Sequence, residues 1–281
     1  MSAFGLGELP GTSMEEAADV VRSESPLPHV PQLPERGVGS DAVGRTAALL
    51  DIPIDRGPRG WRVATQHRAA RDRMPRDLDI LQECWGSVEE LKVQLVGPWS
   101  LAAEIEMGNG HRMITDPGAL RDVTEALLQA AGEHRADVEK RFGARTVLQL
   151  DEPRLNDVMR GTLAGPTRYH DIPAFPEPLE RLAPFGEFLL HTDVLVGAGW
   201  LTVDLERITG AGEKDALARL LESGTRLAVA PVEPATLWRL FDELQIDPAG
   251  VELDVWARPA PTLLESARRY AEAREMAEGL R

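Results

Sequence analysis

The sequence predicts a β/α barrel of the (β/α)8 TIM type, built as a single domain over residues 1–281. Three observations lead to this prediction. Short apolar, β-branched runs alternate with helical patterns, which is the order typical of parallel α/β folds. Eight such runs occur, and eight is the strand number of this barrel. The length of 281 residues is also close to the ~250 residues of a typical barrel of this kind.

The predicted strands are short and rich in Val, Leu and Ile. They cover residues 3–9, 91–96, 146–150, 167–172, 187–194, 200–205, 226–230 and 251–256. Strands of a parallel sheet are covered on both faces, so we expect their apolar side chains to form the core. The core positions expected on this basis are Leu150, Leu189, Leu190, Val203 and Val229.

The predicted helices follow capping residues and carry apolar residues at helical spacing. Thr12 or Ser13 can cap the first helix, whose first turn contains Glu15 and Glu16. The remaining helices are predicted over residues 41–50, 77–85, 116–139, 214–222, 235–244 and 262–280. Residues 25–40 are too rich in proline and glycine for a regular element, and we predict a long loop there.

One connection is too short for a regular barrel. Only residues 194–199 separate Asp193, near the end of the predicted fifth strand, from Trp200, where the sixth begins, whereas a parallel crossover normally needs about a dozen residues or more. Either the crossover helix between strands five and six is missing, or one of the two strands is misassigned. Both segments have strong strand patterns, and we therefore favour a missing helix.

Charge and cysteine content exclude several functions. A net charge of −15 argues against nucleic acid as a partner, because such proteins need a basic surface to displace counterions. The single cysteine, Cys84, excludes an intrachain disulfide framework and a multi-cysteine metal site. Cys84 falls in a predicted helix, and we interpret it as a small buried residue.

No membrane or secretion signal is found in the sequence. No apolar run approaches the ~20 residues that cross a bilayer, and the N-terminus lacks the charged-then-apolar pattern of a signal peptide. We therefore expect a cytoplasmic protein with no membrane partner and with a small-molecule ligand. The sequence does not predict an oligomeric state.

Ionisable residues gather at the predicted carboxyl ends of the strands, where barrel enzymes have their active sites. A single carboxylate there can also be a helix cap or an arginine partner, and a single histidine can simply be hydrogen-bonded. The residues expected at this edge are Glu8, Trp99, Asp151, Glu152, His170, Asp171, His191, Asp193, Asp204, Glu233 and Trp256.

Several of these segments resemble motifs of cobalamin-independent methionine synthase. Residues 5–12 (GLGELPGT) resemble its first-strand motif, Ile-Gly-Ser-Phe-Pro-x-Thr, and residues 97–101 (GPWSL) its Gly-Pro-Val-Thr-Ile segment. Residues 149–153 (QLDEP) match its Gln-Ile-Asp-Glu-Pro motif almost letter for letter. Residues 191–193 (HTD) and 201–204 (LTVD) stand where the family has His-x-Cys and Ile-Thr-Ile-Glu. The resemblance spans nearly the whole chain in the correct order and implies the family's catalytic barrel.

The resemblance implies a methyltransferase. The family moves a methyl group from a methylated polyglutamyl folate to homocysteine. Its zinc ion, bound by one His, two Cys and one Glu, holds the substrate thiol as a thiolate. A free thiol with a pKa near ~8.5 is mostly protonated at neutral pH, and a soft cation lowers that pKa.

The same resemblance assigns roles residue by residue. For the metal it implies His191, with Asp193 in place of the first cysteine and Asp204 in place of the glutamate, while the second cysteine falls at or near Trp256. A site without sulfur would suit a weakly held Zn²⁺, Mn²⁺ or Mg²⁺. Asp151 matches the aspartate that holds the substrate ammonium, and Glu8 replaces a serine at the amino-acid substrate. The residues expected to be catalytic are Asp151, Glu152 and His191, and those expected to bind substrate are Glu8, Trp99 and Asp151.

These assignments leave three functions open. The first is a divergent methyltransferase, transferring one carbon to a thiol or related nucleophile, with weak or no homocysteine methylation because the zinc cysteines are absent. The second is a non-catalytic barrel, a pseudoenzyme that binds a small molecule or a protein. The third, a porphyrinogen-type decarboxylase, needs arginines near the first strand end, and neither Arg22 nor Arg36 has that setting. In either of the first two, the acidic edge should attract a cationic ligand and raise a carboxylate pKa by like-charge crowding.

Overall fold

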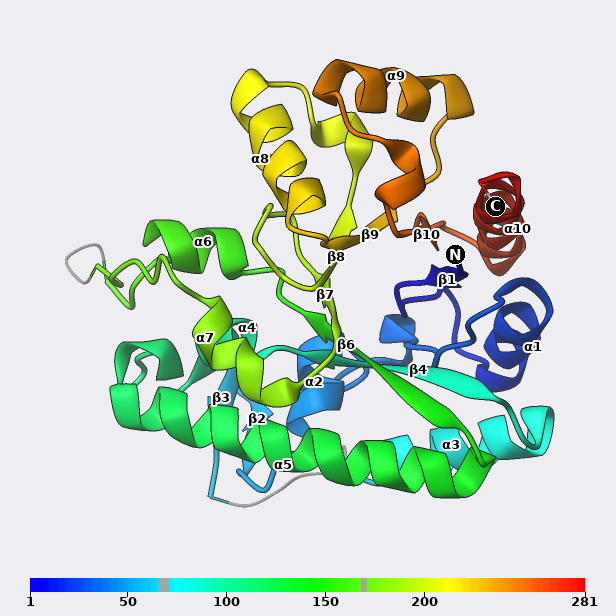
Figure 1. Ribbon diagram of the computed structural model, residues 1–281. Helices are drawn as coiled ribbons and strands as arrows, with labels where there is room; N and C mark the ends of the chain where they lie inside the picture. Colours follow the sequence, from blue (N-terminus) through cyan, green and yellow to red (C-terminus); the bar gives the residue numbers. More distant parts are fainter. Residues whose placement is uncertain (66–70, 168–170, 281) are drawn as a thin grey trace.

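The computed structural model describes residues 1–65, 71–167 and 171–280. Its central feature is a curled sheet of seven parallel strands, with helices around the outside (Figure 1). In spatial order the strands are β1 (Ala3–Gly5), β10 (Leu253–Ala257), β9 (Arg226–Val229), β8 (Trp200–Val203), β7 (Leu189–His191), β6 (Arg145–Asp151) and β4 (Glu90–Val96).

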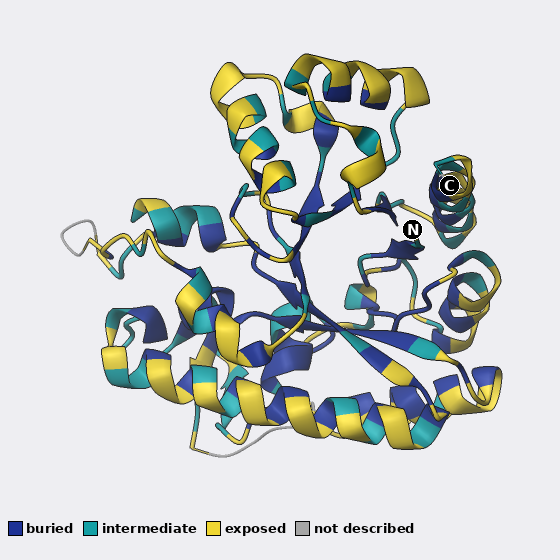
Figure 2. Ribbon diagram, viewed as in Figure 1, coloured by how far each residue is buried: buried dark blue, intermediate teal, exposed yellow. Residues whose placement is uncertain are grey.

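Helices enclose this sheet and expose their polar faces. Figure 2 shows the strands buried and the outer helix faces exposed, which is how a parallel sheet covered by helices is stabilised. The helices are α1 (Met14–Glu24), α2 (Ala42–Ala47), α3 (Arg73–Trp85), α4 (Pro98–Glu104), α5 (Pro117–Phe142), α6 (Leu155–Arg160), α7 (Leu179–Leu182), α8 (Ala211–Glu222), α9 (Pro234–Leu244) and α10 (Leu263–Gly279).

The expected core and most expected helices are confirmed. Leu150, Leu189 and Leu190 are completely buried, and Val203 and Val229 nearly so. Ser13 caps α1 by accepting a hydrogen bond from the Glu16 backbone N–H at 3.2 Å. The short helices α4, α6 and α7 were not predicted, because four to seven residues carry too little periodicity to be recognised.

The predicted fourth strand, residues 167–172, is wrong. Thr167, Asp171 and Ile172 belong to no strand, and residues 168–170, which include the expected edge residue His170, lie outside the described residues. The physical reason is the pairing of the sheet: β6 pairs directly with β7, in the register Gln149↔Leu189, and no strand fits between them.

The crossover between β7 and β8 contains no helix, as predicted. β7 and β8 pair in parallel at Leu190↔Leu201, and residues 192–199, all of them described, contain no helix. The chain returns to the start of β8 along an irregular path. This connection therefore adds no helix to the layer around the sheet.

A closed eightfold barrel is not formed, because the eighth position holds no strand. An extended, buried segment, residues 27–33, lies between β1 and β4 and hydrogen-bonds to both. The Leu27 N–H donates to the Ala3 carbonyl at 3.2 Å, and the Lys92 N–H donates to the Pro28 carbonyl at 2.8 Å. Pro28 and Pro31 have no N–H to donate, so the segment makes isolated bridges instead of a ladder.

Two further features differ from the sequence interpretation or add to it. Cys84 is exposed and not buried, because it falls beside the buried stripe of α3 that runs through Leu78, Leu81 and Trp85. A small second sheet, not predicted, contains β2 (Ile54–Arg56), β3 (Trp61–Val63) and β5 (Ile105–Glu106).

In the part of the chain that the structure describes, no helix has the length and apolarity to cross a membrane.

Candidate functional site

The expected site residues Asp151 and His191 lie side by side at the carboxyl ends of β6 and β7. They are register partners across the parallel pair, and Val96 of β4 is the partner of Asp151 on its other side. A cavity of about 230 Å³ opens over this edge. Its polar lining consists of Glu8, Gln32, Asp151, His191, Arg258, Ser266 and Tyr270.

A second cavity, of about 310 Å³, adjoins the first. The two cavities share Pro153 and His191 in their linings. Asp193, Asp204 and Trp256 line the second cavity and not the first. The structure therefore brings Glu8, Asp151 and His191 to one cavity, and Asp193 and Asp204 to the adjoining one.

Asp151 is almost completely buried, with one strong hydrogen bond from a neighbouring amide. The Gln149 side-chain Nε2 donates to Asp151 Oδ1 at 2.6 Å, from the same strand. Burial raises the pKa of Asp151, while the Gln149 hydrogen bond and the nearby Lys92 ammonium lower it. A carboxyl group in this position can switch its charge near neutral pH.

We expected like-charge crowding to raise the pKa of a carboxylate at this edge. The pKa is raised, but the main cause is burial. For both Asp151 and Glu8, burial is the largest effect that raises the pKa. Like-charge crowding comes second: Glu8 raises the pKa of Asp151, and Asp41 raises that of Glu8. Glu8 keeps contact with solvent although it lines the cavity.

His191 is a neutral imidazole with one ring nitrogen engaged. Its Nδ1 lies 3.0 Å from the hydroxyl of Thr202 on β8. Burial, assisted by the Lys92 charge, lowers the pKa of His191 to about 4. At neutral pH the ring can therefore donate or accept a hydrogen bond with a ligand, but it is a weak base.

The expected metal ligands are not arranged to hold a metal. Both oxygens of Asp204 accept hydrogen bonds from Arg258, at 2.8 and 2.9 Å, and Arg258 also pairs with Glu206 at 2.9 Å. Within residues 1–65, 71–167 and 171–280, no three His, Cys, Asp or Glu side chains are grouped for metal binding. The bound guanidinium would also repel a cation, so the residues present do not fit the zinc of the methionine-synthase family.

Glu152 has a structural position and does not line either cavity. Its carboxylate accepts hydrogen bonds from the Trp99 N–H at 3.0 Å and the Ser100 N–H at 2.7 Å, at the start of α4, and from the Ser100 hydroxyl at 2.6 Å. Burial raises the pKa of Glu152 to about 7, against the effect of these donors. These contacts anchor α4 to the end of β6, and they place the carboxylate of Glu152, expected to be catalytic, outside the linings of both cavities.

Trp99, expected to bind substrate, lies at a different surface. Its indole Nε1 donates to the Pro178 carbonyl at 3.0 Å, and its ring lies 4.9 Å below the Arg181 guanidinium. Trp99 lines a separate cavity of about 540 Å³ with Phe175 and Glu180. The structure does not bring it to the Asp151 cavity.

Sequence reasoning missed six polar residues of this site. Lys92 and Gln149 lie buried next to Asp151. The other four line the Asp151 cavity: Gln32, Arg258, Ser266 and Tyr270. A signal for Lys92 was present, since LKVQLV places a lysine and a glutamine in an otherwise apolar strand. Buried lysines are rare unless they are paired, so such a residue indicates a partner inside the fold.

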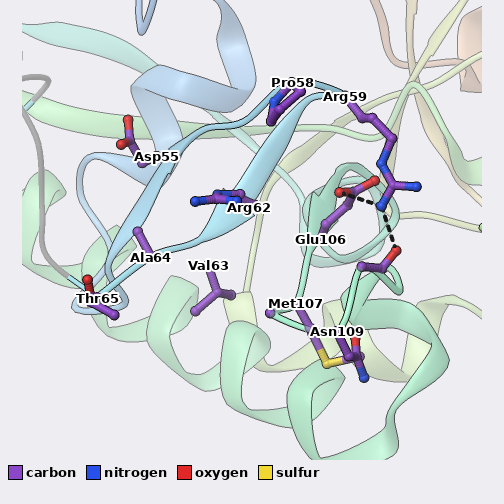
Figure 3. Close-up of a pocket in the computed structure, with 12 residues that line it drawn as sticks. Asp55, Pro58, Arg59, Arg62, Val63, Ala64, Thr65, Glu106, Met107 and Asn109 are labelled. Atoms are coloured by element: carbon purple, nitrogen blue, oxygen red, sulfur yellow. Dashed lines mark hydrogen bonds and ion pairs between the residues drawn. The ribbon is translucent and has the colours of Figure 1, made fainter.

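A larger cavity, of about 840 Å³, lies elsewhere, between the β2–β3 hairpin and the turn after β5 (Figure 3). Arg59 there donates to Glu106 and to the Gly110 carbonyl, both at 3.1 Å. None of the residues predicted from the sequence to form a site lines this cavity. Its charged groups include the internal ion pair of Arg59 with Glu106.

These features define an α/β protein with a curled parallel sheet and a small polar cavity at the carboxyl ends of its strands. Among solved structures, it is similar to the proposed vitamin-B12-independent methionine synthase of Listeria monocytogenes. The TM-score is 0.51 at 14% sequence identity, over 99% of this chain and 96% of that chain. No protein-family model and no curated protein sequence matches the chain. At this identity, the likeness shows a similar fold and nothing finer.

Proposed function

We propose that this chain is a divergent member of the methionine-synthase-like fold that binds a small, amine-bearing molecule and does not methylate homocysteine through zinc. The observation that carries the proposal is the charge of the Asp151 cavity. Its wall holds two carboxylates, Glu8 and Asp151, while its lining arginine, Arg258, is already paired with Asp204 and Glu206. A cavity with this balance attracts positive charge.

The proposal agrees with the chemistry of the other lining groups. His191 and Tyr270 are uncharged at neutral pH, since burial lowers the pKa of the first and raises that of the second. They can orient a ligand by hydrogen bonds without adding charge. The volume of about 230 Å³ suits a molecule of amino-acid size.

A second candidate is a methyltransferase of different substrate and mechanism. The two adjoining cavities that meet at His191 favour it, because group transfer needs room for two reactants. Against it stands the weak basicity of His191, which makes it a poor proton acceptor at neutral pH.

Binding can be tested by calorimetry and thermal shift with methylammonium, amino acids including homocysteine and methionine, and short diamines. We expect Asp151→Asn to weaken an amine ligand roughly tenfold or more, the loss expected for one charged hydrogen bond. The control is Asp215→Asn, an exposed carboxylate on α8. An absence of hits, or hits that Asp151→Asn leaves unchanged, would refute the binding proposal.

The chemical half of the proposal is tested separately. Purified protein should form no significant methionine from homocysteine and a methylated polyglutamyl folate, with or without added zinc. Robust methionine formation would overturn the assignment and would require a metal arrangement other than that of His191, Asp193 and Asp204.

A further inference from the structure

A lysine is buried inside the sheet, directly below the candidate site. Lys92, in the middle of β4, has no exposed surface. Its ammonium lies 5.5 Å from the centre of the Phe4 ring on β1. Removing a cation from water is costly unless hydrogen bonds and an opposite charge compensate it. Burial lowers the pKa of Lys92 to about 7, and the Asp151 charge raises it. The charged form of Lys92 therefore depends on a compensating anion nearby.

Two glutamines surround the ammonium group. Gln149 Oε1 accepts a hydrogen bond from Lys92 Nζ at 2.5 Å. In the orientation that satisfies both of its amide atoms, Gln94 also accepts from Lys92 Nζ, at 3.2 Å, and donates to the Val30 carbonyl at 3.2 Å. These amides solvate the cation but carry no charge themselves.

The Gln149 amide links this lysine to the cavity. Its Nε2 donates to Asp151 Oδ1 at 2.6 Å and to the Leu6 carbonyl at 2.7 Å. The Leu6 carbonyl can only accept, so it fixes the Nε2 end of the amide on the Asp151 side and the Oε1 end on the Lys92 side. This orientation makes Lys92 a donor and leaves Asp151 as an acceptor.

We propose that Lys92 is the internal counter-ion of Asp151: through the Gln149 amide it favours the ionised form of this carboxyl over the protonated form, and it thereby sets the pH range over which the cavity takes up a cation. Lys92 is a positioning residue, because it acts through Gln149 and Asp151 and does not line the cavity. Only the statement about cation uptake rests on the proposed function; the counter-ion relationship does not.

The other titratable groups around the pair do not replace this charge. Burial and the Lys92 charge lower the pKa of both His29 and His191, so these rings are neutral. Burial raises the pKa of Tyr270, which stays protonated. Glu8 opposes ionisation of Asp151, and Arg258 is engaged by Asp204 and Glu206. Among the described residues, Lys92 is the cation that favours the Asp151 carboxylate.

The decisive experiment is a carbon-13 NMR titration of the aspartate carboxyl groups, in which Asp151 is identified by the signal missing from Asp151→Asn. We expect Lys92→Met to raise the Asp151 titration midpoint by about one pH unit or more, the effect of removing a neighbouring opposite charge. Lys140→Met, which removes an exposed lysine on α5, should leave the midpoint unchanged. An unmoved Asp151 midpoint in Lys92→Met would overturn the proposal.

A second measurement covers the case in which Lys92→Met does not fold. The double variant Lys92→Met with Asp151→Asn removes both charges together. At a pH above the Asp151 midpoint it should fold, and it should be more stable than Lys92→Met alone, because no uncompensated carboxylate remains. Equal or lower stability of the double variant would mean that Lys92 only fills space, and would contradict the counter-ion role.

A pH series of methylammonium binding then separates the two proposals. If both hold, the binding midpoint in Lys92→Met moves to higher pH together with the Asp151 midpoint. If wild-type protein binds no methylammonium at any pH while the NMR midpoint still moves, the proposed function fails for this probe and the counter-ion relationship stands. Binding whose pH midpoint is the same in wild type and Lys92→Met would refute the control of uptake by Lys92.

Discussion

Arg258 donates a hydrogen bond to each carboxylate oxygen of Asp204, at 2.8 and 2.9 Å. This planar, two-point contact is the arrangement that guanidinium and carboxylate groups favour. It places a positive charge at the position where the resemblance to methionine synthase implied a metal-binding carboxylate. The charge requirement of Asp204 is therefore met by the protein itself.

The first prediction concerns zinc. Protein purified without added metal should contain well below one equivalent of zinc by elemental analysis. His191→Ala should barely change the thermal midpoint, because no metal-linked folding energy would be lost. Stoichiometric zinc that survives dialysis against a chelator would contradict the prediction and would mean that Arg258 can be displaced from Asp204.

The second prediction concerns the core. Leu190 lies in β7 and is completely buried. Leu190→Ala should lower the free energy of unfolding by ~2–5 kcal/mol in denaturant melts, the usual range for a large-to-small core change. The matched control is Leu128→Ala on α5, at a position that is 37% exposed, where we expect about 1 kcal/mol or less. Similar losses at both positions would contradict the placement of β7.

The third prediction concerns the anchoring of α4 by Glu152. Glu152→Ala leaves the Trp99 and Ser100 N–H groups without their acceptor, and it should cost ~1–3 kcal/mol of unfolding free energy. Glu152→Gln keeps an acceptor oxygen and should cost less.

The pH dependence of Glu152 provides a further check. Burial raises its pKa from 4.5 to about 7, so the folded state binds this proton more tightly than the unfolded state. Its contribution to unfolding free energy therefore falls as the pH rises between these values. Relative to Glu152→Gln, the wild type should lose stability from pH 5 to pH 7. If the difference in unfolding free energy between wild type and Glu152→Gln does not change with pH, the raised pKa of Glu152 is refuted.

The fourth prediction concerns His134, a buried residue of α5. Burial, and next the charge of Arg45, lower its pKa from 6.5 to about 4. The unfolded chain then binds more protons than the folded one between these values, and stability is lost as the pH falls through this range. The stability advantage of wild type over His134→Gln should shrink between pH 7 and pH 4.5 in denaturant melts. An advantage that grows on acidification would contradict the prediction.

Several parts of the structure were accessible from sequence because they depend on near neighbours in the chain. The strand at residues 145–151 and the helix from Pro117 are determined by local apolar patterns and caps. The missing helix between β7 and β8 followed from the length of the connection alone. Asp151 and His191 could be expected at one edge because the carboxyl ends of parallel strands meet there.

The remaining features needed the tertiary structure, because they join residues far apart in the chain. Proline removes the N–H groups that a strand at residues 27–33 would need, yet only the edges of β1 and β4 show that this segment lies between them. The Arg258–Asp204 pair spans 54 positions, and the Lys92–Gln149 bond spans 57. Local pattern determined which residues stand at strand ends. Long-range packing decided whether each carboxylate caps a helix, pairs with an arginine or faces the cavity, because this depends on which distant side chain lies next to it in the folded chain.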